Sequence, residues 1–175
     1  MSENLRVLVV DDTVIYRKVV SDVIDEIPDA EVVGVAHDGK IAMSKIGTLK
    51  PDILTLDIEM PEMDGLEVLD KMRREAPDTG AIMLSTLTQK GGEMTMKALE
   101  LGAFDFIPKP ETRSLEESRL AVKNALTPML KAFARRKEVR TILQSKGALV
   151  RPTIPFSPAQ GGEALQGRRR GTSEI

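Results

Sequence analysis

Two hydrophobic patterns alternate along the first two thirds of the chain. Short, mostly apolar runs, of which Leu5 to Val10 is the first, are typical of buried strands. The segments between them carry apolar residues at helical spacing: Val19, Val23 and Ile27 recur every four positions and so share one helix face. The alternation predicts five strand–helix units. The predicted strands are residues 5–10, 31–36, 52–57, 81–85 and 104–108, and the predicted helices are 13–27, 40–49, 65–75, 91–101 and a last one that begins near 114.

The predicted strands are almost continuously apolar, with many Val, Ile and Leu residues. Strands of this kind indicate a sheet that is covered on both faces. Strands that alternate with helices favour a doubly wound α/β fold, in which helices cover both faces of a parallel sheet. Five such units predict a five-stranded sheet in the order 2-1-3-4-5.

The last predicted helix is longer than the sheet requires. Its pattern extends from Ser114 to about Ser145, and Pro128 inside it is expected to kink or break it. Beyond Gly147 the chain is rich in proline and glycine, a composition typical of linkers. The sequence therefore predicts a compact domain over 1–127, a helical extension over 128–146 and a flexible linker or tail over 147–175. Whether 114–145 form one helix stays open at this point.

The amino-acid composition excludes several kinds of functional site. The chain has no cysteine, which excludes disulfides and cysteine-based sites, and its single histidine disfavours a zinc site or an internal Ser-His-Asp triad. No apolar run approaches the roughly 18–20 residues that span a bilayer. No signal-peptide pattern opens the sequence. A cytoplasmic protein without membrane contact is expected.

Charge is unevenly distributed along the chain. Acidic residues outnumber basic ones up to residue 130, and basic residues prevail after it. The stretch from Lys131 to Arg140 is basic, but no DNA-binding motif surrounds it. A solvated helix face explains this stretch better than a nucleic-acid surface, so no nucleic-acid partner is expected.

Acidic side chains follow two strands that the predicted order makes neighbours. Asp11 and Asp12 come directly after the first strand, and Asp57 ends the third. Ligands of open parallel sheets bind beyond the carboxyl ends of the strands, at the point where the strand order reverses. The fold therefore brings these three carboxylates into one crevice, where they repel one another unless a cation or protons compensate.

Mg²⁺ is the cation that fits this set of ligands, because it prefers oxygen ligands and combines one or two carboxylates with phosphate oxygens. A carboxylate beside Mg²⁺ can also act as a nucleophile and form an aspartyl phosphate. Lys109 ends the fifth strand and could pair with phosphoryl oxygens, and Ser85 ends the fourth and could donate a hydrogen bond to them. Polar residues at four strand ends thus point to phosphoryl chemistry.

These residues resemble those of bacterial two-component response-regulator receiver domains. The matching segments are Val-Leu-Val-Val-Asp-Asp at 7–12, Asp-Ile-Glu-Met-Pro-Glu-Met-Asp-Gly-Leu at 57–66, Leu-Gly-Ala at 101–103 and Lys-Pro at 109–110. The resemblance covers residues 5 to about 127. It implies a flavodoxin-like fold and a switch that a sensor histidine kinase of the chemotaxis type phosphorylates with Mg²⁺ as cofactor.

The resemblance also implies residue roles. Asp57 would be the phosphoacceptor, with Mg²⁺ held by Asp57, by Asp12 directly, by Asp11 mostly through water and by the backbone carbonyl of Glu59. Lys109 would contact the phosphoryl group, and the Lys109–Pro110 peptide bond would be cis. The switch pair would be Phe106 with a hydroxyl from Ser85 or Thr86, of which Ser85 is favoured. Phosphorylation would change the face formed by the fourth helix, the fifth strand and the fifth helix, a face that could also support a homodimer.

A narrower resemblance extends from Ser85 to Gly91 and from Ala98 to Pro110. These runs are similar to the receiver of chemotaxis protein-glutamate methylesterases of the CheB type. In that family a linker and a methylesterase domain follow the receiver. The chain contains no esterase nucleophile motif, so the resemblance implies a non-enzymatic switch whose effector domain lies beyond Ile175.

Three alternatives remain open at this level. The first is a stand-alone receiver without an effector domain. The second is a phosphatase with an aspartyl-phosphate intermediate, which is disfavoured because Glu59 stands where such enzymes usually have a second Asp. The third is a structural pseudo-receiver, which is disfavoured because no residue of the predicted site is missing.

Overall fold

A five-stranded parallel sheet organises the computed structural model, which describes residues 3–86, 89–111 and 114–145. The strands lie in the order β2-β1-β3-β4-β5, and every neighbouring pair is parallel, so the predicted fold class is confirmed. The strands are β1 (Leu5–Val10), β2 (Ala30–Ala36), β3 (Ile53–Asp57), β4 (Gly80–Ser85) and β5 (Asp105–Pro108). The helices are α1 (Val14–Glu26), α2 (Gly39–Leu49), α3 (Gly65–Glu75), α4 (Gln89–Glu100) and α5 (Leu115–Ser145).

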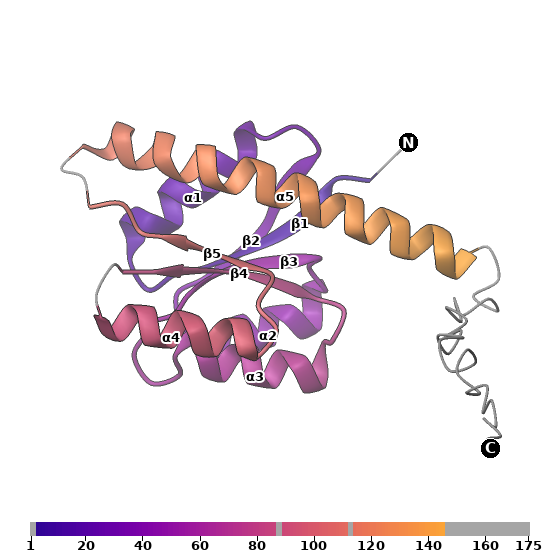
Figure 1. Cartoon of the computed structure of the whole chain (residues 1–175), viewed down its shortest axis with the longest axis horizontal. Helices are drawn as coiled ribbons and strands as arrows, with labels where there is room; N and C mark the ends of the chain where they lie inside the picture. The colour runs from indigo at the N-terminus through magenta and orange to yellow at the C-terminus, as the bar shows by residue number, and fades with distance from the viewer. Residues whose placement is uncertain (1–2, 87–88, 112–113, 146–175) are drawn as a thin grey trace, which may run out of the picture. The chain divides into compact units, whose positions relative to one another are not determined.

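The helices cover the two faces of the sheet, with α1 and α5 on one face and α2, α3 and α4 on the other (Figure 1). Successive strand residues point to opposite faces. In β1, Val7 and Val9 therefore enter the core beneath α1 and α5, and Leu8 and Val10 enter the core on the other side. This arrangement explains why the strands are apolar at nearly every position.

Polar side chains fix where three helices begin. Thr13, Asp38 and Asp64 are the N-caps of α1, α2 and α3, and each accepts a hydrogen bond from a backbone N–H of the first turn. Gly65 lets α3 begin close to the end of β3, because a Cβ at this position would lie 2.4 Å from the carbonyl oxygen of Asp57. The loop after Asp57 is therefore held tightly at the carboxyl edge of the sheet.

The last helix is continuous through its proline. Residues Leu115–Ser145 form one helix with Pro128 inside it, so the proline does not break the helix. An interior proline costs roughly 3 kcal/mol or more, because it removes one hydrogen bond and crowds the preceding turn. Leu126 and Leu130, on either side of Pro128, are buried in the same core. Burial of these side chains offsets the cost of the proline.

Residues beyond Pro128 pack on the sheet. The Phe133 ring meets the Phe104 ring edge-on at 5.3 Å between centroids, and its edge lies where a side chain at Gly80 would otherwise sit. Two residues of the basic stretch take part in this packing: Arg136 lies over the Phe104 ring, and Lys137 Nζ lies 2.7 Å from Asp52 Oδ1. The compact unit that contains the sheet runs to Lys137, so these side chains belong to the same unit as the sheet.

This packing leads to a stability prediction. Replacing Phe133 by Ala is expected to lower the free energy of unfolding by about 3 kcal/mol, because it leaves a cavity against Gly80 and Phe104. Urea denaturation followed by circular dichroism measures the change. Leu120→Ala, on the exposed side of the same helix, is the control and should change stability by less than about 0.5 kcal/mol. Equal effects of the two substitutions would contradict the packing.

Within the described ranges, no helix combines the length and the apolar character that crossing a membrane requires.

Candidate functional site

Three carboxylates meet at the carboxyl edge of the sheet. Asp11 and Asp12 follow β1, Asp57 ends β3, and β1 and β3 are adjacent. One oxygen atom from each carboxylate lies within 4.8 Å of the other two. Asp11 and Asp57 are buried, with 2% and 3% of their surface exposed, whereas Asp12 is exposed. The structure thus brings together the three acidic residues that the sequence singled out and leaves one of them open to solvent.

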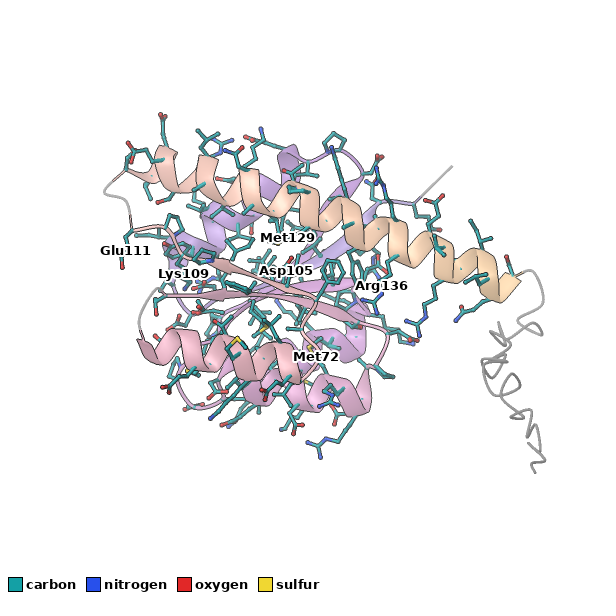
Figure 2. All side chains as sticks on the ribbon, in the orientation of Figure 1. Met72, Asp105, Lys109, Glu111, Met129 and Arg136 are labelled. Carbon is teal, nitrogen blue, oxygen red and sulfur yellow. The ribbon has the colours of Figure 1, made fainter. Side chains whose placement is uncertain are left out.

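Lys109 supplies the positive charge within this site. Its Nζ lies 3.1 Å from Asp11 Oδ2 and 3.2 Å from Asp57 Oδ2, and the residue is buried. The Lys109 backbone N–H donates to the Ser85 carbonyl oxygen at 2.7 Å, which fixes the residue after β5 to the end of β4. Figure 2 shows Lys109 at one end of the sheet and Arg136 toward the other. The ammonium group bridges two carboxylates that would otherwise repel each other.

Two further residues orient the site, and the sequence analysis did not find them. Thr13 donates from its backbone N–H and its hydroxyl to Asp11 Oδ1, at 2.9 and 2.8 Å. The Tyr16 ring lies 4.5 Å from Lys109 Nζ, and its hydroxyl donates to the Pro110 carbonyl oxygen at 3.3 Å. Thr13 could have been found, because a Thr two residues after an Asp and before a helix is a common capping pattern. The role of Tyr16 depends on the packing of α1 against the end of β5, which no local pattern reveals.

The electrostatics of the site favour a bound cation. Burial, together with the negative charge of Asp11, raises the pKa of Asp57 from 3.8 to about 7, although Lys109 acts in the opposite direction. Burial acts to lower the pKa of Lys109, but the two carboxylates outweigh it and raise this pKa. One ammonium group therefore does not fully compensate the buried carboxylates, and an oxygen-preferring divalent cation would fit the three-carboxylate cluster.

The raised pKa of Asp57 predicts how pH and Mg²⁺ together affect stability. Between pH 4 and pH 7 the folded chain keeps a proton on Asp57 that the unfolded chain has lost, so the contribution of Asp57 to the free energy of unfolding falls as pH rises and levels off above pH 7. Mg²⁺ binds ionised carboxylates and displaces this proton. Millimolar Mg²⁺ should therefore raise the melting temperature more at pH 8 than at pH 5.5. An equal shift at both pH values, or none, would contradict this account.

The predicted switch residues lie in three different environments. Ser85 is buried, and its hydroxyl oxygen lies 2.9 Å from that of Thr95 in α4. The Thr86 hydroxyl oxygen is buried without a hydrogen-bond partner in the described part of the chain. Phe106 lies on β5 and is 39% exposed.

The Glu59 backbone N–H donates to Asp57 Oδ1 at 3.3 Å. That the Glu59 carbonyl group is a metal ligand stays a prediction.

The predicted cis bond between Lys109 and Pro110 is wrong, because this peptide bond is trans in the structure. Proline lowers the preference for trans to about 0.5–1 kcal/mol without removing it. With the trans bond, Lys109 reaches both carboxylates and the Pro110 carbonyl group accepts the Tyr16 hydrogen bond.

The fold and the site together define a known class of protein. The sequence matches the response regulator receiver domain family over residues 7–120, and the chain belongs to this family. The crystal structure of the response regulator domain of Thermotoga maritima CheB is similar to it, with 42% sequence identity, a TM-score of 0.65 and coverage of 75% of this chain and 97% of that one. The resemblance to CheB-type receivers is thereby confirmed.

Curated relatives extend further than this chain. A protein-glutamate methylesterase/protein-glutamine glutaminase of Desulfotalea psychrophila is 52% identical over 157 residues, which cover 89% of this chain and 42% of the relative. A protein of the same description from Pyrococcus abyssi is 40% identical over 157 residues, or 86% of this chain and 42% of the relative. The chain thus spans less than half the length of these relatives and corresponds to their receiver part.

Proposed function

We propose that this chain is a phosphorylation-controlled switch in which Asp57 accepts a phosphoryl group from a phosphohistidine of a sensor histidine kinase, of the kind that serves chemotaxis, in the cytoplasm. The observation that carries the proposal is the position of Asp57, which is buried beside Asp11 and Asp12 with Lys109 Nζ at 3.2 Å. The family to which the chain belongs supports the same role.

In this proposal the carboxylates of Asp11, Asp12 and Asp57 and the carbonyl group of Glu59 would hold Mg²⁺. When bound, the ion would neutralise negative charge on the carboxylates and on the incoming phosphoryl oxygens. Asp57 must be ionised to attack phosphorus, and its raised pKa makes the ionised form reactive but costly. One Asp57 oxygen forms the new P–O bond as the P–N bond to the imidazole breaks.

Lys109 has a defined part in this transfer. Its ammonium group already lies at hydrogen-bond distance from Asp57, and it pairs with a phosphoryl oxygen once the group is bound. Thr13 and Tyr16 act indirectly: Thr13 fixes the Asp11 carboxylate, and Tyr16 lies against the Lys109 side chain. These contacts hold the acceptor in place before the phosphoryl group arrives.

The output proposed for this switch is control of a methylesterase domain beyond Ile175. The identity of these relatives as protein-glutamate methylesterases and the share of their length that the chain covers support it. Residues 147–175 would be the linker, which lies outside the described residues. Exposed apolar side chains lie on α4, on β5 and at the start of α5, among them Met96, Phe106 and Leu115, and they suit contact with such a domain or with a second copy of the chain.

Incubation with acetyl phosphate and Mg²⁺ tests the proposal. One phosphoryl group per chain should be incorporated as an acyl phosphate that hydroxylamine cleaves, and chelation of Mg²⁺ should prevent the reaction. A chemotaxis-type histidine kinase labelled with phosphate should transfer its label to the chain. The absence of labelling with both donors, or sustained turnover of small phosphate esters, would contradict the proposed switch.

A further inference from the structure

Thr95 is a buried polar residue outside the predicted site. It lies in α4, and 5% of its surface is exposed, among otherwise apolar contacts of α4 with the sheet such as the fully buried Ala98. Its hydroxyl oxygen lies 2.8 Å from the Gly91 carbonyl oxygen and 2.9 Å from the Ser85 hydroxyl oxygen. A polar contact in this place joins the end of β4 to α4.

The hydrogen atoms available decide the direction of these bonds. A threonine hydroxyl has one hydrogen, and in helices it commonly donates to the carbonyl group four residues earlier, which here is Gly91. Because Thr95 donates its hydrogen to Gly91, Ser85 is the donor and Thr95 the acceptor in the hydrogen bond between the two hydroxyl groups. Among the described residues, the Thr86 carbonyl oxygen also lies near Ser85 Oγ, but at 3.4 Å it is at the limit of a hydrogen bond. The Ser85 hydrogen is therefore directed to α4.

We propose that Thr95 is a positioning residue that holds the Ser85 hydroxyl group against α4 in the unphosphorylated chain, in competition with the phosphoryl group on Asp57. The inference rests on the proposed function and adds a regulatory step to it. The Ser85 hydroxyl group has a single hydrogen, which cannot be donated to Thr95 and to a phosphoryl oxygen at the same time. The two states of the switch thus differ in the acceptor of one hydrogen bond.

Release of Ser85 has a consequence for α4. A phosphoryl oxygen is a charged acceptor and forms a stronger hydrogen bond than a neutral hydroxyl group, so the exchange favours the phosphorylated state. Thr95 then keeps its bond to Gly91 but loses the one that joins it to β4. Phosphorylation thereby removes the hydrogen bond between β4 and α4, which is the helix on the proposed output face. The equilibrium between two positions of α4 shifts as a result.

The Thr95→Val substitution tests this competition, because valine keeps the shape of threonine and removes its hydroxyl group. The probe is beryllofluoride with Mg²⁺, which mimics a phosphoryl group on a carboxylate, and the measurement is its apparent affinity from the chemical shifts of backbone amides. Without Thr95 as competing acceptor, the affinity should rise about three- to tenfold, the range expected for one neutral hydrogen bond. Thr95→Ser keeps the hydroxyl group and should leave the affinity unchanged.

The same substitution in a Ser85→Ala chain distinguishes this mechanism from a general destabilisation of α4. In Ser85→Ala the competing hydroxyl group is absent, so adding Thr95→Val should produce no further change in affinity. Thr95→Ala serves as a second variant that removes the acceptor if the valine side chain prevents folding, and it should raise the affinity in the same way.

Three results would overturn the inference. In the first, the parent chain binds beryllofluoride but neither Thr95→Val nor Thr95→Ala raises the affinity. In the second, Thr95→Val raises the affinity in the Ser85→Ala background as well. Both results leave the proposed function intact. The third is that the parent chain does not bind beryllofluoride, which overturns the proposed function and the inference with it.

Discussion

The Asp57→Asn variant is expected to take up no phosphoryl group from acetyl phosphate or from a kinase, and at pH 8 without Mg²⁺ to be more stable than the parent chain. The first effect is a loss of at least about a hundredfold in labelling, because an amide oxygen is a far weaker nucleophile than the carboxylate that forms the acyl phosphate. The second effect arises because the substitution removes one of two buried negative charges that share a single ammonium group.

The expected gain in stability follows from the pKa of Asp57. At pH 8 the parent chain must keep Asp57 ionised although burial raises its pKa from 3.8 to about 7, so the ionised carboxylate destabilises the folded state. A tenfold change in a protonation equilibrium corresponds to about 1.4 kcal/mol, and the lost contact with Lys109 offsets part of the gain, so an increase of about 1–3 kcal/mol is expected. The gain should shrink as pH falls below 7, where the parent carboxyl group becomes protonated.

Urea denaturation at pH 8 and pH 5.5 measures this difference. Asp25→Asn, which changes an exposed residue of α1, is the matched control and should alter neither labelling nor stability by much. A variant that is less stable than the parent at pH 8 would show that the buried carboxylates are well compensated, contrary to the electrostatics of the site. Phosphorylation that persists in Asp57→Asn would assign the acceptor to another residue.

The Lys109→Met variant is expected to have the opposite effect on stability. Methionine keeps much of the apolar stem of lysine but leaves Asp11 and Asp57 buried without their shared cation. Removal of one member of a buried ion pair typically costs about 3–5 kcal/mol. Proton uptake by Asp57 limits the cost, so we expect a loss of about 3 kcal/mol at pH 8 without Mg²⁺ and a smaller loss at pH 5.5.

Mg²⁺ distinguishes electrostatic from packing causes of this loss. A divalent cation near the three carboxylates replaces the missing charge, so Mg²⁺ should stabilise Lys109→Met more than it stabilises the parent chain. Lys71→Met, on the exposed side of α3, is the control and should respond to Mg²⁺ as the parent does. If Mg²⁺ stabilised both chains equally, the lysine would contribute through packing and not through its charge. Thermal unfolding of the parent and the two variants, each with and without Mg²⁺, measures these effects.

Much of the fold and the centre of the site follow from local patterns. Apolar runs and helical spacing predicted all five strands and the strand order, because a sheet covered on both faces needs near-continuous apolar strands. The positions of Asp11, Asp57 and Lys109 at strand ends were then sufficient to bring them together. In a parallel sheet the carboxyl ends of the strands lie at one edge, so functional side chains at these ends lie close together even when they are far apart in the sequence.

What the sequence could not predict depends on contacts between elements. Tyr16 and Thr95 lie inside helices, and nothing in the spacing of their neighbours distinguishes them from ordinary helical residues until α1 and α4 are packed on the sheet. Pro128 carried a clear local signal for a helix end, but the buried residues on either side of it outweighed that signal. The isomer of the Lys109–Pro110 bond was missed because the free-energy difference between the isomers is small compared with tertiary contacts.

The packing of Phe133 on Gly80 also determines how the chain can be shortened. A piece that ends at residue 127 lacks the ring that covers Gly80 and Phe104 and lacks the buried Leu130 side chain. Apolar groups at the amino-terminal edge of β4 and β5 would then face water, beside backbone that is well suited to pair with another molecule. The position of the cut therefore sets the tendency of the isolated domain to aggregate, independently of how well its phosphorylation site is preserved.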